Sequence, residues 1–160
     1  MAYRWFPMTL RHRVHTVLSY PPRRWGDLIV AAVVATRAEI AIRRHGVSAA
    51  ARVGGLQVAM DGLAAPVGSL REARLSDREL ERLDTAWRVL RWGPFNGTCL
   101  RRAVVGGYFL RARKPLLRIG VNKSEGKVAA HAWVEVGGVG LDPDGGDIYL
   151  VLRDPGEAAT

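Results

Sequence analysis

The sequence predicts an α+β protein whose first two thirds are helical and whose last third forms a small antiparallel sheet. Apolar residues recur at helical spacing up to about residue 113. One stretch, at Ser76, also carries the residues that typically begin a helix. After Pro115 the apolar residues alternate along short runs that glycine turns separate. With 160 residues, of which 48% are hydrophobic, the chain is expected to form one compact domain with its own core.

The N-terminal third is predicted to be helical, with breaks at prolines and glycines. Pro21 and Pro22 interrupt the first apolar pattern, and Gly46 stands at the C-cap position of the second. Gly54 and Gly55 weaken the third. The expected elements are helices over Leu10–Ser19, Trp25–His45 and Val47–Met60, followed by a loop over Asp61–Leu70.

The clearest local signal is the stretch LSDRELERLDTAWRVLRW, which begins at Leu75. Ser76 and Glu79 have capping-box spacing, because the serine hydroxyl can accept from an early N–H while the glutamate reaches back to the cap. Leucines and a tryptophan then recur on one helical face, at Leu80, Leu83, Trp87 and Leu90. The stretch therefore predicts a helix that packs against the core and ends at Gly93 and Pro94.

A further helix is predicted over Cys99–Arg113, and strands follow it. The segments LLRIGVNK, VAAHAWVEV, VGLDP and DIYLVL have the branched residues and the alternation of strands. Gly126 marks one turn, and Gly137 with Gly138 marks a tight hairpin. We therefore expect an antiparallel sheet after Pro115, and a frayed tail over residues 156–160.

The positive charge is concentrated at the front of the chain. The net charge is +9, and residues 1–52 hold nine arginines against Asp27 and Glu39 alone. Such a surface attracts nucleic acid, anionic membranes or acidic proteins. No aromatic platform or nucleic-acid motif accompanies the arginines, so no nucleic-acid partner is expected. The longest apolar run, Leu28–Thr36, is too short for a membrane span.

Cys99 is the only cysteine, which excludes an internal disulfide and fits a reducing, cytoplasmic compartment. No secretory signal is expected, because MAYRWFPMTLRHRVH has no continuous apolar run followed by a small-residue cleavage site, and no Cys/His cluster offers the spacing of a zinc site. Cys99 stands at the first turn of a predicted helix, where unpaired N–H groups and the helix dipole favour a thiolate. Its place predicts a nucleophile rather than core filler.

A cysteine nucleophile requires a base, and His131 is the best candidate because it lies on a predicted strand after the cysteine helix. The hairpin at Gly137–Gly138 brings Asp142 onto the neighbouring strand, where a carboxylate can orient the imidazole. Asp144 is the alternative third member. The predicted catalytic residues are therefore Cys99, His131 and Asp142, with no metal.

This order of residues resembles the transglutaminase-like cysteine peptidases of lasso-peptide biosynthesis. The resemblance lies in CLRRAVVGGYFLRAR, LRIGVNK, AHAWVEV and LDPDGG, and it spans Gly93 to Leu152. It places the family triad on Cys99, His131 and Asp142, whereas Ala103 replaces a serine common in the family. It implies a papain/transglutaminase-like core in which a central cysteine helix packs on a small antiparallel sheet.

The resemblance also implies a function. The stand-alone leader peptidase of that family removes the leader from a ribosomally made precursor without a cofactor, beside a separate leader-recognition protein, and an ATP-dependent cyclase then closes the ring. Accordingly, residues 1–75 are expected to form a basic helical docking region for the partner or the leader, and residues 76–155 the catalytic core. Thiol alkylation should inhibit the enzyme, and chelators should not.

Other residues near the nucleophile are candidates for substrate binding. Asn96 is polar and lies three residues before Cys99, and Trp133 lies two residues after His131 on the same predicted strand. Arg101 and Arg102 are near the nucleophile in sequence, and their guanidinium groups could contact the backbone or carboxylates of a substrate. The Cys99 N–H at the helix start is one natural oxyanion donor, and the second is open. Two other functions are retained: an acyltransferase that uses an amine as acceptor, and a non-catalytic basic module that binds peptide or nucleic acid.

Overall fold

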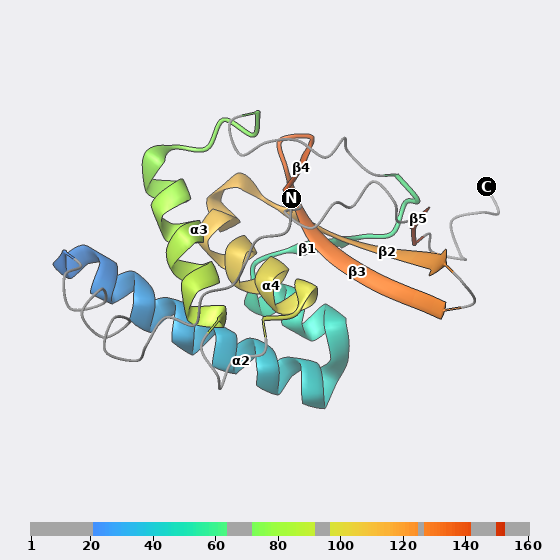
Figure 1. The fold of residues 1–160 in the computed structure, drawn as a ribbon, viewed down its shortest axis with the longest axis horizontal. Helices are drawn as coiled ribbons and strands as arrows, with labels where there is room; N and C mark the ends of the chain where they lie inside the picture. The colour runs from blue at the N-terminus through green and yellow to red at the C-terminus, as the bar shows by residue number, and fades with distance from the viewer. Residues whose placement is uncertain (1–20, 64–71, 92–96, 125–126, 142–149, 153–160) are drawn as a thin grey trace.

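A computed structural model of the chain describes residues 21–63, 72–91, 97–124, 127–141 and 150–152. Within them, three α-helices gather beside a five-stranded sheet (Figure 1). The elements in chain order are α2 (Pro22–Val53), β1 (Gln57–Ala59), α3 (Asp77–Leu90), α4 (Cys99–Leu110), the 3-10 turn η1 (Arg111–Arg113), β2 (Leu116–Ser124), β3 (Lys127–Val136), β4 (Val139–Leu141) and β5 (Leu150–Val151). The predicted α+β class is confirmed.

α2 is a long helix with one interruption at a glycine. Gly46 has φ 77° and ψ −168°, a conformation that ends the first part of the helix where the sequence predicted its end. The predicted third helix is wrong beyond Val53. There the chain turns and residues Gln57–Ala59 form β1, because they pair in parallel with Leu116–Arg118. This pairing with a distant strand overrides the local helical pattern.

α3 confirms the predicted capping box. The Ser76 hydroxyl accepts from the Glu79 N–H at 3.3 Å, and the Glu79 carboxylate accepts from the Ser76 N–H at 2.8 Å. Arg113, in the turn after α4, donates to the same carboxylate at 2.8 and 2.9 Å. The Arg113 hydrogen bonds, followed by those from Ser76, lower the pKa of Glu79 from 4.5 to about 2. Glu79 thus joins the start of α3 to the end of α4.

The sheet is mixed, whereas an antiparallel sheet was predicted. The order is β1-β2-β3-β4, with β5 beside β2, and among the described strands only the β1–β2 pair is parallel. The predicted hairpin is confirmed: Gly137 and Gly138 have φ of 58° and 77°, as the tight turn between β3 and β4 requires.

α4 is the central helix, since it contacts α2, α3 and strands β2 and β3. Its Val104 is fully buried, in one apolar cluster with Ala50 of α2, Leu83 of α3 and Leu117 of β2. The front of the chain therefore supplies part of the core that surrounds the cysteine helix. In the described part of the chain, no helix is long and apolar enough to cross a membrane.

Some predictions fall on residues outside the described ranges. These are the helix over Leu10–Ser19, most of the loop over Asp61–Leu70, and the tail over 156–160. Gly93 and Pro94, which were predicted to end the helix from Ser76, also lie outside them, and α3 ends earlier, at Leu90, with Arg91 as its C-cap.

We expect Glu79→Gln to lower the free energy of unfolding by about 1–2 kcal/mol at pH 7, because it weakens both the capping box and the Arg113 ion pair. The folded-state pKa is depressed, so this contribution is complete above about pH 5 and is lost as the pH falls towards 2. Urea unfolding of both proteins between pH 7 and pH 2.5 measures the difference.

Asp84→Asn is the control, because Asp84 forms only an exposed i,i+4 pair with Arg88. Its effect should stay within about 0.5 kcal/mol. An equal loss in the two variants, or a loss in Glu79→Gln that does not shrink in acid, contradicts the assignment.

Candidate active site

Cys99 is the first residue of α4 and is half-buried. The preceding Thr98 makes no side-chain cap bond; its hydroxyl instead accepts from the Arg101 guanidinium at 2.8 Å. Helix geometry leaves the N–H groups of the first turn without intrahelical acceptors. The nucleophile candidate therefore lies beside main-chain donors and at the positive end of the helix dipole, as the sequence predicted.

The backbone before Cys99 is held in place by close packing. A Cβ atom on Gly97 would lie 2.9 Å from the carbonyl oxygen of Leu90, so only glycine fits between this segment and the end of α3. The Arg102 Nε–H donates to the Gly97 carbonyl oxygen at 2.9 Å. These contacts determine where the first turn of α4, and with it Cys99, lies.

His131 lies on β3 and is only 7% exposed. It pairs across the sheet with Gly120, which has no side chain. Its ring stacks on Trp133, with centroids 5.8 Å apart and an angle of 22° between the planes. Stacking and burial restrict the imidazole to one setting, which is what a general base requires.

Cys99 and His131 line the same pocket, although 32 residues separate them in the sequence. The pocket follows one side of α4, where Cys99, Ala103, Gly106 and Leu110 recur at helical spacing. The remaining lining residues are Leu83 and Trp87 of α3, Arg102 of α4, Ala132, Trp133 and Val134 of β3, and Leu141 of β4. The fold thus brings a thiol and an imidazole to one largely apolar cavity.

The described β3–β4 pairing ends next to this pocket. The last described pair is Val134 with Leu141, and both residues line the cavity. The predicted third member, Asp142, directly follows Leu141 and lies outside the described residues, as do the alternative Asp144 and the candidate Asn96.

Of the two arginine candidates, only Arg102 lines the pocket. Arg101 bonds to Glu39 of α2, with Nε 2.6 Å from the carboxylate, so it joins two helices instead. Hydrogen bonds from Arg101, and then from Arg43, lower the pKa of Glu39. Successive side chains on a helix point about 100° apart, so only one of these two arginines can face the pocket. The sequence alone did not show which one.

Trp133 lines the pocket and is 3% exposed, and its indole N–H has no hydrogen-bond partner among the described residues. Trp133 therefore forms part of the wall of the cavity, beside His131.

Two features were not predicted from the sequence: the α3 wall of the pocket and a buried ion pair in the sheet next to it. Leu83 and Trp87 were assigned to packing, yet they form the α3 wall of the pocket. On β2, Arg118 is 5% exposed and pairs with Glu135 of β3 at 2.9 Å, and it also bonds Asp61. The signal for this buried pair was one charged residue between apolar neighbours in each strand, Arg118 in LLRIG and Glu135 in WVEV.

A comparison with family models finds a match to the transglutaminase-like superfamily over residues 33–152. This range includes Cys99, His131 and every described element except the first part of α2. No curated protein and no solved structure matches the chain.

We expect Arg102→Ala to lower the reactivity of Cys99 towards an anionic reagent, because it removes a cation from the pocket. The ratio of alkylation rates with iodoacetate and iodoacetamide should fall at least about threefold, since only iodoacetate carries a charge. Cys99 is the sole cysteine, so mass spectrometry of the whole protein measures the rates at one site.

Arg101→Ala is the matched control on the same turn. It loses the Glu39 ion pair and the hydrogen bond to Thr98 but keeps every residue that lines the pocket, so its rate ratio should stay close to that of the wild type. Equal ratios in all three proteins would show that Arg102 exerts no field at the sulfur.

Proposed function

The chain belongs to the transglutaminase-like superfamily, which is typically made up of cysteine-dependent peptidases and acyltransferases, and on this premise we propose that it is a leader peptidase. Its substrate is the leader-containing precursor of a lasso peptide. The observation that carries the proposal is the pocket shared by Cys99, at the start of a helix, and His131, on a strand. The motifs around both residues support the peptidase within the superfamily.

In the proposed reaction, the Cys99 sulfur attacks the scissile carbonyl carbon while His131 accepts the thiol proton. The negative charge on the carbonyl oxygen is stabilised by main-chain N–H groups of the first turn of α4. The C–N bond then breaks, and His131 gives its proton to the leaving amine. Water attacks the resulting thioester, His131 takes the proton of the water and returns it to the sulfur, and the leader leaves as an acid.

Asp142 is proposed to accept a hydrogen bond from His131, which fixes the tautomer and stabilises the imidazolium. A carboxylate in this position holds the ring with one nitrogen towards the sulfur. The burial of His131 supports such an arrangement, because a buried imidazolium requires a compensating charge.

The proposed partners follow from the same resemblance. A separate leader-recognition protein delivers the precursor, and an ATP-dependent cyclase uses the amine that cleavage releases. The proposed compartment is the cytoplasm, where a single thiol stays reduced.

We expect Cys99→Ala and His131→Ala each to reduce precursor cleavage at least about a thousandfold, because each removes a group that forms or breaks bonds. Mass spectrometry of a precursor incubated with the protein and a leader-recognition protein measures release of the intact leader. His45→Ala is the matched histidine control, since His45 is exposed on α2, and it should cleave at the wild-type rate.

Equal cleavage by the wild type and Cys99→Ala contradicts the assignment of the nucleophile. A product joined to an added amine, in place of the free acid, identifies an acyltransferase. Near-ultraviolet circular dichroism of each variant establishes that it is folded.

We expect Asp142→Asn to lower kcat at least about a hundredfold while leaving KM within a few fold, because the wrong tautomer of His131 impairs chemistry more than binding. Asp144→Asn serves as the comparison and should retain most of the activity. The reverse ranking in the same cleavage assay assigns the role to Asp144.

A further inference from the structure

The outward side of α2 is apolar, although it faces solvent. Ile29, Val33 and Ile40 are 63%, 51% and 47% exposed, and Trp25 is 37% exposed. Their spacing places all four on one side of the helix. We call these four residues the outer stripe.

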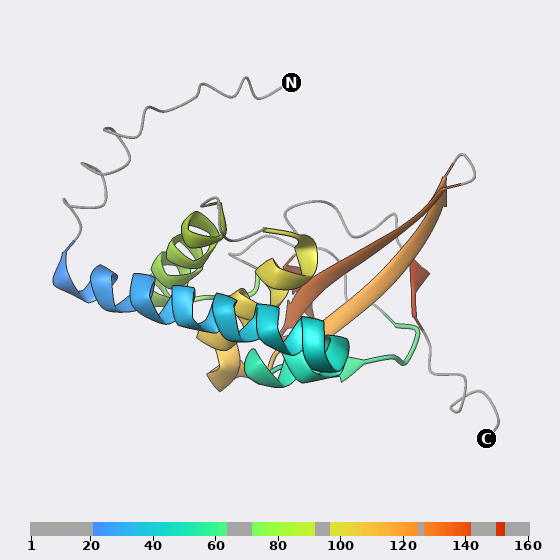
Figure 2. The ribbon, with the colours of Figure 1, turned by 90° about the horizontal axis from the view of Figure 1, so that it is seen from below.

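The opposite side of α2 is buried against α3 and α4, through Leu28, Ala31, Val34, Ala35 and Ala38. Figure 1 shows α2 along the lower edge of the molecule, with α3, α4 and the sheet above it, and in Figure 2, seen from below, α2 crosses in front of them. The helix is therefore apolar on two opposite sides, but among the described residues only the side that faces α3 and α4 is covered by other parts of the protein. Exposed apolar surface arranged in this way marks an interaction site.

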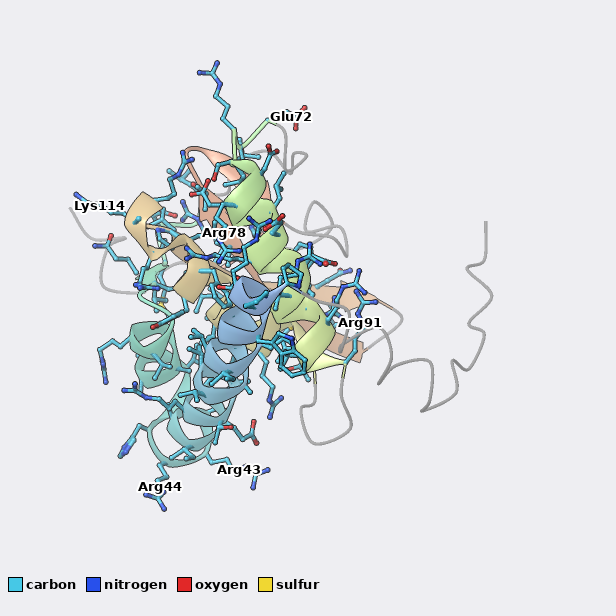
Figure 3. All side chains as sticks on the ribbon, turned by 90° about the vertical axis from the view of Figure 1, so that its left-hand side faces the viewer. Arg43, Arg44, Glu72, Arg78, Arg91 and Lys114 are labelled. Carbon is cyan, nitrogen blue, oxygen red and sulfur yellow. The ribbon has the colours of Figure 1, made fainter. Side chains whose placement is uncertain are left out.

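Two arginines accompany the outer stripe. Arg37 and Arg44 are exposed and lie along the same side of the helix. Arg37 lies between Val33 and Ile40, and Arg44 lies one turn beyond Ile40. Figure 3 shows Arg44, with Arg43, at the far end of α2 from α3 and pointing away from the protein. Neither Arg37 nor Arg44 has an ion-pair partner among the described residues.

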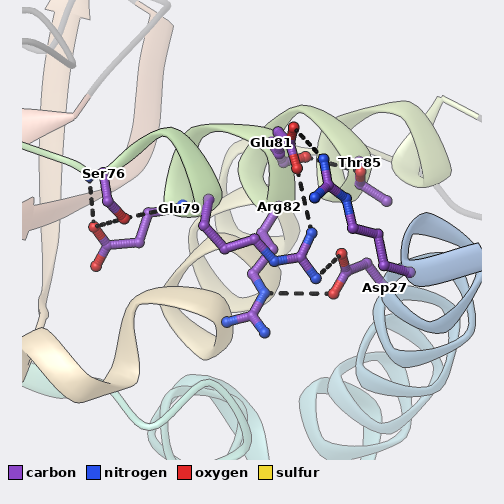
Figure 4. A network of polar contacts seen from close by, with 8 residues as sticks. Asp27, Ser76, Glu79, Glu81, Arg82 and Thr85 are labelled. Carbon is purple, nitrogen blue, oxygen red and sulfur yellow. Dashed lines mark hydrogen bonds and ion pairs between the residues drawn. The ribbon is translucent and has the colours of Figure 1, made fainter. Parts of the chain in front are cut away.

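The two carboxylates of α2 are occupied elsewhere. Asp27 is buried and pairs with Arg78 at 2.7 Å and with Arg82 at 3.4 Å (Figure 4). Glu39 binds Arg101 and also Arg43, the latter at 2.6 Å. The α2 helix itself therefore offers no carboxylate to Arg37 or Arg44, and both guanidinium groups are open to an acidic partner.

We propose that the outer stripe, with Arg37 and Arg44, binds an amphipathic helix of a partner protein that carries apolar residues along one face and carboxylates opposite the two arginines. From Trp25 to Arg44 the surface is about 30 Å long, which suits a helix of five to six turns. Burial of the stripe supplies most of the affinity, and the arginines select an acidic partner. The inference does not depend on the proposed catalysis.

Other occupants fit the charges less well. Residues 1–20 of this chain contain no Asp or Glu, so they leave both arginines unpaired. A second copy, whose α2 carboxylates are likewise occupied, brings a net charge of +9 towards another +9. An anionic membrane favours free cations along both edges of an apolar stripe, whereas on the other edge Arg43 is paired with Glu39.

The test uses the full chain and two synthetic helical peptides of 21 residues. Both carry leucines along one face; one has glutamates and the other lysines at the positions that meet Arg37 and Arg44. Fluorescence anisotropy should show binding of the glutamate peptide with a Kd on the order of 10 µM, and at least about tenfold weaker binding of the lysine peptide.

Variants identify the surface. Arg37→Glu/Arg44→Glu should reverse the preference between the two peptides, and Ile29→Ser/Val33→Ser should weaken binding of the glutamate peptide at least about tenfold. Arg52→Glu/Arg91→Glu, which changes two exposed arginines outside the stripe, is the matched control and should bind as the wild type does. Thermal unfolding confirms that each variant is folded.

Four results overturn the proposal. The first is absence of binding to the glutamate peptide below 1 mM, and the second is binding that the charge reversal leaves unchanged. The third is stripe-dependent binding to phosphatidylglycerol vesicles with no binding of the peptides, which assigns the surface to a membrane. The fourth is a dimer in light scattering that Ile29→Ser/Val33→Ser dissociates, which assigns it to a second copy.

Discussion

The close packing of α4 is the constraint on which the rest of the structure depends. A Cβ atom on Gly54 would lie 2.7 Å from the carbonyl oxygen of Val104, and one on Gly97 would lie 2.9 Å from that of Leu90. Backbone therefore meets backbone where α4 passes the end of α2 and where its preceding segment passes α3. Because backbone contacts of this kind cannot adjust as side chains do, they fix the start of α4, and hence the position of Cys99.

The sheet determines the position of His131, as the packing of α4 determines that of Cys99. The β2–β3 register places Gly120 opposite His131 and Arg118 opposite Trp133. The buried ion pair between Arg118 and Glu135 opposes a slip of this register, since a shift by one residue would separate these two buried charges. The position of the imidazole relative to the thiol therefore results from helix packing on one side and strand register on the other.

Local signals in the sequence predicted much of this arrangement. The capping box at Ser76 and Glu79 and the turn at Gly137–Gly138 are complete within a few residues, so the sequence shows them directly. β1 was missed because three residues become a strand only through pairing with Leu116–Arg118, far along the chain. The pocket's α3 wall was missed for a similar reason: which apolar residue packs and which lines a cavity is decided by the neighbouring element.

α2 connects the outer stripe to the candidate active site. Glu39 lies on α2 between Arg37 and Arg44 in sequence, and it binds Arg101, two residues after the nucleophile. An α-helix is about 10 Å across with its side chains, so a partner helix on the outer stripe would lie about one helix thickness from the first turn of α4. A partner bound there could hold a substrate close to Cys99 without occupying the pocket. Recognition would then use the outer side of α2, whereas cleavage would use the pocket that residues of α3, α4, β3 and β4 line.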